Sequence, residues 1–168
     1  MRNIRHISAH GSDKMKTILE KEIILTSEDE KTNIVLPFEV GEESERLRIT
    51  YSYSPKELGD CERAKELIEK NLENDTHGDR HLYPDYKFYL PLKNLVTLSL
   101  NSPSRYMGAA HRQDKDQCHI ISEDFSSVGF LKGKIEKGQW ILYLNVHALV
   151  TESCTCKVKI EAGGDACE

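Results

Sequence analysis

The sequence lacks any long hydrophobic run: no window approaches the roughly 20 consecutive apolar residues that a membrane-spanning helix requires. The basic residues Arg2 and Arg5 near the start are not followed by the apolar segment of a secretory signal. Cysteine is also sparse, with five residues at no repeated spacing, so a disulfide framework is not indicated. We therefore expect a cytoplasmic protein with reduced thiols and no membrane partner.

An excess of positive charge is missing too. The chain carries 23 Lys and Arg against 28 Asp and Glu, which gives a formal net charge of -5. Because nucleic-acid-binding domains rely on clustered positive charge, this balance argues against nucleic acid as a partner. The sequence also lacks the motifs of a nucleophile elbow, a glycine-rich phosphate loop and an HExxH zinc site. It therefore predicts no enzyme activity and no cofactor.

The sequence does contain short alternating segments, and the clearest lies within residues 130–146, FLKGKIEKGQWILYLNV. Trp140, Leu142, Leu144 and Val146 fall on one face of this segment, and the residues between them fall on the other. A period of two residues is typical of a strand with one buried face. We therefore expect the only Trp of the chain to open a strand close to the core.

Several further strands are predicted. Over residues 47–53, large apolar residues alternate with polar ones, which indicates a half-buried strand. Within residues 32–40, Pro37 cannot donate a backbone hydrogen bond, so this strand is expected at an edge or at a bulge. The remaining strands are expected over residues 18–25, 94–100, 117–121 and 154–160, and a loop is expected over residues 101–112.

One amphipathic helix is predicted among these strands. Residues 54–57, Ser-Pro-Lys-Glu, have the form of a capping box, and Asp60 is a competing N-cap because Gly59 weakens an earlier start. Beyond Asp60, apolar residues recur at helical spacing. We expect an inserted helix over about residues 56–74, followed by an irregular aromatic segment, residues 80–92, lying over a sheet edge.

These patterns together predict an all-β fold. We expect one antiparallel β-sandwich of jelly-roll-like character, with about seven or eight strands and one inserted α-helix. A chain of 168 residues suits a single domain with its own core. The expected organisation is a flexible tail over residues 1–15, the sandwich over residues 16–162 and a frayed tail over residues 163–168.

Four segments, taken in order and spacing, resemble a known domain. They are FEVGEESERLRITYSYSP (residues 38–55), NLVTLSLNSP (94–103), RYMGAAHR (105–112) and FLKGKIEKGQWILYL (130–144). They resemble the N-terminal β-sandwich that precedes the catalytic domain in one group of polymerase-and-histidinol-phosphatase (PHP) metal-dependent hydrolases. That group has a strand pair F-x-V … L-x-V-x-Y-x-Y, a strand N-x-x-D-L-x-L, an Arg-Gly-Trp-Ser loop and a turn and strand Y-L-P-G-x-L-x-x-G-x-W.

This chain departs from the family pattern in ways that bear on function. Thr97 stands where the family often has Asp, and Lys132 stands where it has Pro. Tyr, Met and Gly at residues 106–108 replace Gly-Trp-Ser, and the His-x-His motif that opens the family's hydrolase domain is absent. The resemblance therefore implies an accessory sandwich without the enzyme, which binds or positions a ligand or a partner, with a PHP-type hydrolase as a candidate partner.

Candidate ligand-binding residues lie in the loop predicted over residues 101–112; they are Arg105, Tyr106, His111 and Arg112. The family loop also carries arginine at the first and last of these positions. Two guanidinium groups and an aromatic ring on a loop held by a rigid sheet suit a carboxylate, a phosphate or a sugar. The alternative is that Arg105 or Arg112 pairs with a neighbouring acidic residue such as Asp114.

A metal site is the competing hypothesis, and its candidate ligands lie in two places. His77 and His81 have the spacing that places two ligands on one helix face, although Gly78 favours a solvated loop. Cys154 and Cys156 point to the same face of a predicted strand, so their sulfur atoms could share a metal or form a disulfide. The alternative for both cysteines is a buried thiol that packs as a small hydrophobic group.

Three functions are therefore open at the level of the sequence. The first is a non-catalytic accessory or binding domain, with a partner protein or a small anionic or sugar ligand. The second is a small metal-dependent hydrolase that uses the histidine and cysteine ligands. The third is a structural protomer that assembles through an exposed edge strand.

Overall fold

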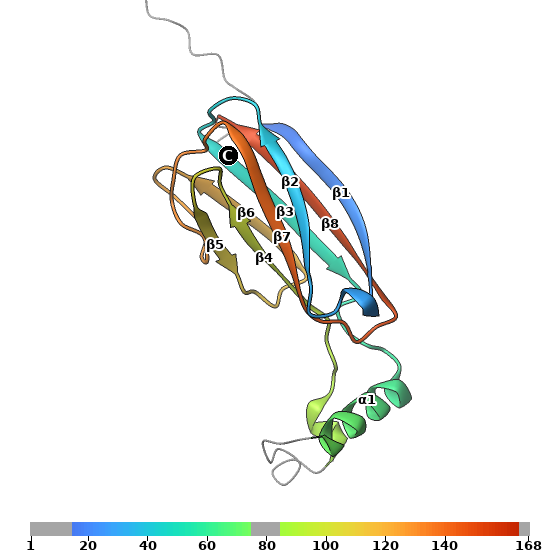
Figure 1. The fold of residues 1–168 in the computed structure, drawn as a ribbon. Helices are drawn as coiled ribbons and strands as arrows, with labels where there is room; N and C mark the ends of the chain where they lie inside the picture. The colour runs from blue at the N-terminus through green and yellow to red at the C-terminus, as the bar shows by residue number, and fades with distance from the viewer. Residues whose placement is uncertain (1–14, 75–84, 165–168) are drawn as a thin grey trace, which may run out of the picture.

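The computed structural model describes residues 15–74 and 85–164, which form two four-stranded antiparallel sheets packed face to face (Figure 1). One sheet has the order β1 (Lys16–Thr26), β8 (Ser153–Gly163), β3 (Arg46–Ser54), β6 (Asp116–Ser122). The other has the order β2 (Asn33–Val40), β7 (Gly138–Ala148), β4 (Leu95–Asn101), β5 (Tyr106–Ala110). The first strand pairs with the last, the second with the seventh and so on inward, which is the pairing of a rolled-up antiparallel ribbon. The prediction of an antiparallel, jelly-roll-like sandwich with one helix is confirmed.

The two inner sheet faces enclose the core, and the predicted alternation is confirmed in the strands that carry it. Trp140 is fully buried on β7, where its ring stacks on Phe38 of β2 at a centroid distance of 6.2 Å. Its indole Nε1 donates a hydrogen bond of 2.9 Å to the carbonyl oxygen of Glu136, so the one polar atom of the ring is satisfied. Pro37 lies on β2, an edge strand, as its missing donor requires.

The last strand is longer than the sequence indicates. β8 continues through Gly163, whose backbone lies opposite Arg46 of β3, whereas the sequence predicts a strand over residues 154–160. The neighbouring inward residue Ala162 is buried. Small residues near the strand end carry little periodic signal, although here they still pair with two neighbouring strands.

The helix α1 (Cys61–Glu73) begins later than about residue 56. Asp60 is the N-cap, and its side chain accepts a hydrogen bond of 3.0 Å from the backbone N–H of Arg63. Residues 56–58 instead pair with residues 92–94 through the bonds Leu58 N–H to Leu92 O, 3.0 Å, and Asn94 N–H to Lys56 O, 2.9 Å. The prediction of a capping box at residues 54–57 is therefore wrong, because residues 56–58 form part of a short two-stranded stalk. The competing prediction that Asp60 is the N-cap is confirmed.

The stalk carries α1 beyond one end of the sandwich (Figure 1). The short 3-10 helix η2 (Tyr86–Tyr89) packs against α1, with the amine of Lys65 lying 5.7 Å from the ring centroid of Tyr86. For the described part of the aromatic segment, the prediction that it lies over a sheet edge is wrong. A second 3-10 helix, η1 (Ser27–Asp29), forms the turn between β1 and β2. No helix in the described residues combines the length and apolar character needed to cross a membrane.

The loop predicted over residues 101–112 contains the strand β5, which is a correction with consequences for function. The segment that follows β6 crosses from one sheet to the other, and we call residues 125–131 the closing segment. The N–H of Ser127 bonds to Ile120 O of β6 at 2.8 Å, and the N–H of Leu131 bonds to Met107 O of β5 at 2.7 Å. The closing segment therefore joins the edge strands of both sheets on this side of the sandwich.

Glycine is required where the closing segment crosses β5. Gly108 and Gly129 have positive φ values of 112° and 100°. A Cβ atom on Gly108 would overlap the carbonyl oxygen of Gly129, and one on Gly129 would overlap that of Ala109. The two backbones can approach this closely because neither residue has a side chain.

We predict that Gly108→Ala or Gly129→Ala lowers the free energy of unfolding by more than about 2 kcal/mol, because each adds backbone strain and a clash with main-chain atoms. Gly41→Ala is the matched control, since a Cβ there meets no atom within 4 Å. It should change stability by less than about 0.5 kcal/mol. Urea unfolding followed by Trp140 fluorescence measures all three. Equal stability of the three variants would contradict the close crossing.

Candidate functional site

Arg105 is exposed, and it also bonds to the chain directly after the closing segment. Its backbone N–H donates to Ser102 Oγ at 3.1 Å, and its Nη2 donates to the carbonyl oxygen of Lys132 at 2.7 Å. The same Nη2 lies 2.6 Å from the place a Cβ on Gly133 would occupy. The guanidinium therefore packs over a glycine and clamps the end of the closing segment to the start of β5.

Arg112 lies beyond the opposite end of β5. Five strand residues, Tyr106–Ala110, separate it from Arg105. At about 3.3 Å per residue, the two arginines are roughly 20 Å apart along the chain direction. The structure therefore places these two residues at opposite ends of a strand, whereas the sequence predicts that both lie in one loop.

The other two residues of the predicted ligand site also lie apart. Tyr106 is 56% exposed at the start of β5. The ring of His111 lies 5.8 Å from the ring of His147, and His147 Nε2 is 2.9 Å from Thr97 Oγ1. Thr97 is thus covered by the side chain of His147. His111 therefore belongs to a small polar group over β4 and β7 and not to an arginine site.

The cysteine pair of the metal hypothesis lies in the core. Cys154 and Cys156 are fully buried on the inner face of β8. Cys154 Sγ lies 3.7 Å from Pro55 O, and Cys156 Sγ lies 3.8 Å from Tyr51 Oη. The hydrogen bond between the thiols and burial raise the pKa of Cys156, while that hydrogen bond lowers the pKa of Cys154. The two sulfur atoms lie close together but face an apolar interior with tyrosine rings.

The histidine ligands of the metal hypothesis, His77 and His81, lie outside the described residues. Within residues 15–74 and 85–164, no three side chains of His, Cys, Asp or Glu are grouped so that they could hold a metal ion. Zinc sites in proteins use three or four such ligands. The described part of the chain therefore gives the two cysteines no further ligand.

A polar junction joins the stalk to the sandwich. Tyr53 Oη donates to Asn94 O at 3.3 Å, and the amine of Lys56 donates both to Tyr53 Oη and, at 2.9 Å, to Asn94 O. Asn94 is fully buried; its Nδ2 donates to Thr151 Oγ1 at 2.7 Å, and its Oδ1 accepts from the N–H of Val150 at 2.7 Å. Burial raises the pKa of Tyr53 to about 12. This junction fixes the stalk to the β7–β8 turn.

A polar pocket of about 280 Å³ lies where the closing segment leaves β6. It is lined by side chains that include Arg112, Asp114, Gln117, His119, Ser127 and Val128. Gln117 and His119 point inward from β6 and are 8% and 2% exposed, while Arg112 is exposed. In the described part of the chain, the guanidinium of Arg112 has neither an ion pair nor a hydrogen bond. It is therefore free to bind an acidic group.

The inner wall of this pocket is an ordered polar pair. Gln117 Nε2 donates to Asp114 O at 2.7 Å, so Gln117 Oε1 is the acceptor for His119 Nε2 at 2.9 Å. The imidazole therefore carries its proton on Nε2. Burial, together with the positive charge of Arg112, lowers the pKa of His119, and the neutral ring lies edge-on to Phe130 at a centroid distance of 5.1 Å. Of the two basic side chains that line the pocket, Arg112 and His119, only Arg112 thus carries a positive charge.

Sequence reasoning placed a strand at residues 117–121 but missed Gln117 and His119 as site residues. The available signal was their position: both occupy inward positions of a strand, where apolar side chains are the rule. Polar residues at such positions require partners and often mark a site or an opening in the core. Recognising this requires knowing which face of the strand is inward, and the short strand leaves that ambiguous.

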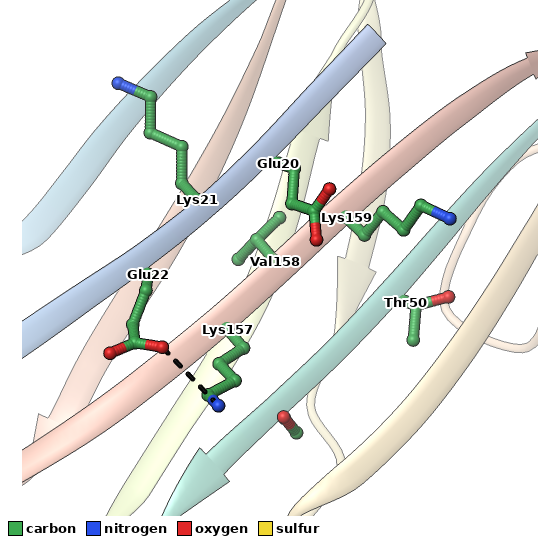
Figure 2. A pocket seen from close by; sticks show the side chains of 8 residues that line it. Glu20, Lys21, Glu22, Thr50, Lys157, Val158 and Lys159 are labelled. Carbon is green, nitrogen blue, oxygen red and sulfur yellow. Dashed lines mark ion pairs between the residues drawn. The ribbon is translucent and has the colours of Figure 1, made fainter. Parts of the chain in front are cut away.

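A second hollow, of about 270 Å³, lies on the outer face of the sheet formed by β1, β8 and β3 (Figure 2). Its charged side chains come from neighbouring strands, and Lys157 Nζ lies 3.4 Å from a carboxylate oxygen of Glu22. Lys159 pairs similarly with Glu161 at 2.8 Å. Exposed pairs of this kind are a solvated surface and contribute little to stability. Lys157 and Lys159 on this face each have an acidic partner, whereas Arg112 at the first pocket has no ion pair among the described residues.

Comparison of the chain with protein-family models, with curated proteins and with solved structures found no match.

The buried cysteine pair makes a prediction about thiol reactivity. In a Cys167→Ser background, Ellman's reagent should modify Cys61 and Cys118 rapidly, because both are exposed. Cys154 and Cys156 should react only as the protein unfolds, since both are buried. Peptide mapping after brief labelling identifies the modified residues. Rapid labelling of Cys154 in native protein would contradict its burial and would make Cys154 and Cys156 candidate metal ligands again.

The buried tyrosine makes a prediction about alkaline stability. The pKa of Tyr53 rises from its ordinary value of 10.0 to about 12 on folding. The contribution of the protonated phenol to the free energy of unfolding is therefore fully present below pH 10 and is lost as the pH approaches 12. Tyr53→Phe should therefore reduce the loss of stability between pH 10 and pH 12 by up to about 1.4 kcal/mol per pH unit. Urea midpoints measured across this range test it. An unchanged slope would show that Tyr53 ionises as an exposed tyrosine does.

Proposed function

We propose that this chain is a non-catalytic binding domain that acts beside a PHP-type hydrolase in the cytoplasm. The observation that carries the binding function is the unpaired Arg112 guanidinium at the polar pocket next to β6. A free arginine beside an ordered, buried polar pair favours recognition of an acidic group on another molecule. The described cysteines are free thiols, which is compatible with a reducing compartment.

The choice of a PHP-type hydrolase as the proposed partner rests on the resemblance of the four sequence segments to the family's accessory sandwich. Three of its four segments meet at one place in the structure: the start of β5, the end of β4 and the closing segment. Two positions at this place carry a structural requirement, because Arg105 clamps the segments together and its guanidinium packs over Gly133. Equivalent requirements would keep arginine and glycine in the family's loop and turn. This supports an accessory sandwich of that kind more than it supports any particular ligand.

A partner protein is favoured over a small ligand as the molecule that is bound. The small-ligand hypothesis relied on Arg105 and Arg112 acting together, and they lie at opposite ends of β5. The remaining pocket is small, polar and open at the edge of a sheet. Such an edge suits the main chain of another protein, which supplies both hydrogen-bond donors and acceptors.

The test is binding to a purified PHP-type hydrolase from the same organism, measured by biolayer interferometry. Wild type should bind, and Arg112→Ala should bind at least tenfold more weakly, a loss of about 1.4 kcal/mol. Lys21→Ala is the matched control, because it also removes one exposed positive charge but lies on β1, at the opposite edge of the same sheet. It should bind as wild type does. Absence of binding by wild type, or equal binding by Arg112→Ala, would contradict the proposal.

A further inference from the structure

We propose that the open part of the β6 edge binds an extended, acidic peptide segment of the partner, which adds to the sheet as a short extra strand beside Arg112. This inference rests on the proposed binding function and names the part of the partner that is recognised. It follows from which backbone groups of β6 are already used, which are left, and which charge lies next to them.

The hydrogen-bonding direction of β6 can be derived from its register with β3. The N–H of Tyr53 bonds to Lys115 O at 2.9 Å, in the same register that pairs β3 with β6. In an antiparallel ladder, residues alternate between bonding to the neighbouring strand and pointing away from it. Gln117 and His119 therefore bond to β3, whereas the N–H and C=O groups of Asp116 and Cys118 point away from it.

The next residues along the same edge confirm this alternation. Ile120 O accepts from the N–H of Ser127 at 2.8 Å, and the N–H of Ser122 donates to Phe125 O at 2.7 Å, so the closing segment occupies this half of the edge. Within the described ranges, the outward backbone groups of Asp116 and Cys118 form no hydrogen bond. The edge thus already accepts one extended segment and leaves room for a second of about three residues.

The charges around the open edge select an acidic occupant. Asp116 lies 4.0 Å from the amine of Lys115, which offsets its charge. The carboxylate of Asp114 interacts electrostatically with the amine of Lys56. Burial and the charge of Lys93 lower the pKa of Lys56, and the carboxylate of Asp114 opposes this shift. His119 is neutral, because burial and Arg112 lower its pKa. The guanidinium of Arg112 has no ion pair and no hydrogen bond among the described residues, so a carboxylate beside the added strand would pair with it.

The other exposed edges carry features that discourage strand addition. Pro37 interrupts the donors of β2. On β1, Lys21 lies opposite Val158 on the side of the sheet that faces inward, and an inward-pointing charge on an edge strand opposes pairing with a further strand. The open stretch of β6 has neither feature. Because Arg112 lies next to this stretch, it can select a peptide that carries an acidic group, which backbone hydrogen bonds alone cannot do.

The experiment uses fluorescence polarisation with the full chain and a labelled, C-terminally amidated heptapeptide, TVTETVT, whose only carboxylate is the glutamate side chain. Two N-methylated versions block alternate N–H groups, one version for each side of the extended peptide. A further peptide, TVTKTVT, reverses the charge. We expect TVTETVT to bind wild type, only one of the two N-methylated versions to lose binding, and TVTKTVT to bind at least tenfold more weakly.

The protein variants separate strand addition from simple charge attraction. Arg112→Ala should weaken TVTETVT at least tenfold, while Lys21→Ala should not change its affinity. Equal binding of all N-methylated and unmodified peptides, or of the glutamate and lysine peptides, would overturn the inference, as would no binding of TVTETVT at millimolar protein. Hydrolase binding that depends on Arg112 but is not displaced by TVTETVT would leave the proposed function standing and reject the β6 edge. Peptide binding without hydrolase binding would reject the hydrolase and keep the edge.

Discussion

The close crossing of Gly108 and Gly129 is the constraint on which the β5–β6 side of this sandwich depends. Two backbones meet there at a distance that only residues without a side chain allow, and the bonds on either side tie the closing segment to β5 and to β6. The crossing closes the space between the two sheets without adding a strand to either. It also decides how much of the β6 edge is covered and how much stays open.

The position of the two arginines follows from the same constraint. Arg105 holds the chain directly after the closing segment through the bond from its guanidinium to Lys132 O, while its side chain stays exposed. Arg112, at the other end of β5, faces the stretch of β6 that the closing segment has already left. Two residues of the same type in one eight-residue segment thus differ: Arg105 has a role in the fold, and Arg112 has a role in recognition only in the function we propose.

At the junction between the stalk and the sandwich, polar groups are buried but satisfied. Asn94 bonds to the stalk and to the β7–β8 turn, and Tyr53 and Lys56 share its carbonyl oxygen. Cys154 and Cys156 lie next to this junction on the inner face of β8. Such a network holds the stalk that carries α1, and because its groups are partnered it offers less to a ligand than the single free guanidinium does.

The sequence by itself determined the strands with strong alternation, their inward faces and the sandwich class. In β3 and β7, large apolar residues at every second position leave one arrangement that buries them, and local periodicity reports it directly. It did not determine β5, because a strand of five residues with Gly108 and two alanines has almost no periodic signal. The separation of Arg105 from Arg112, the crossing and the open edge of β6 were decided only by tertiary structure. They depend on backbone hydrogen bonds between segments distant in sequence, which side-chain pattern does not encode.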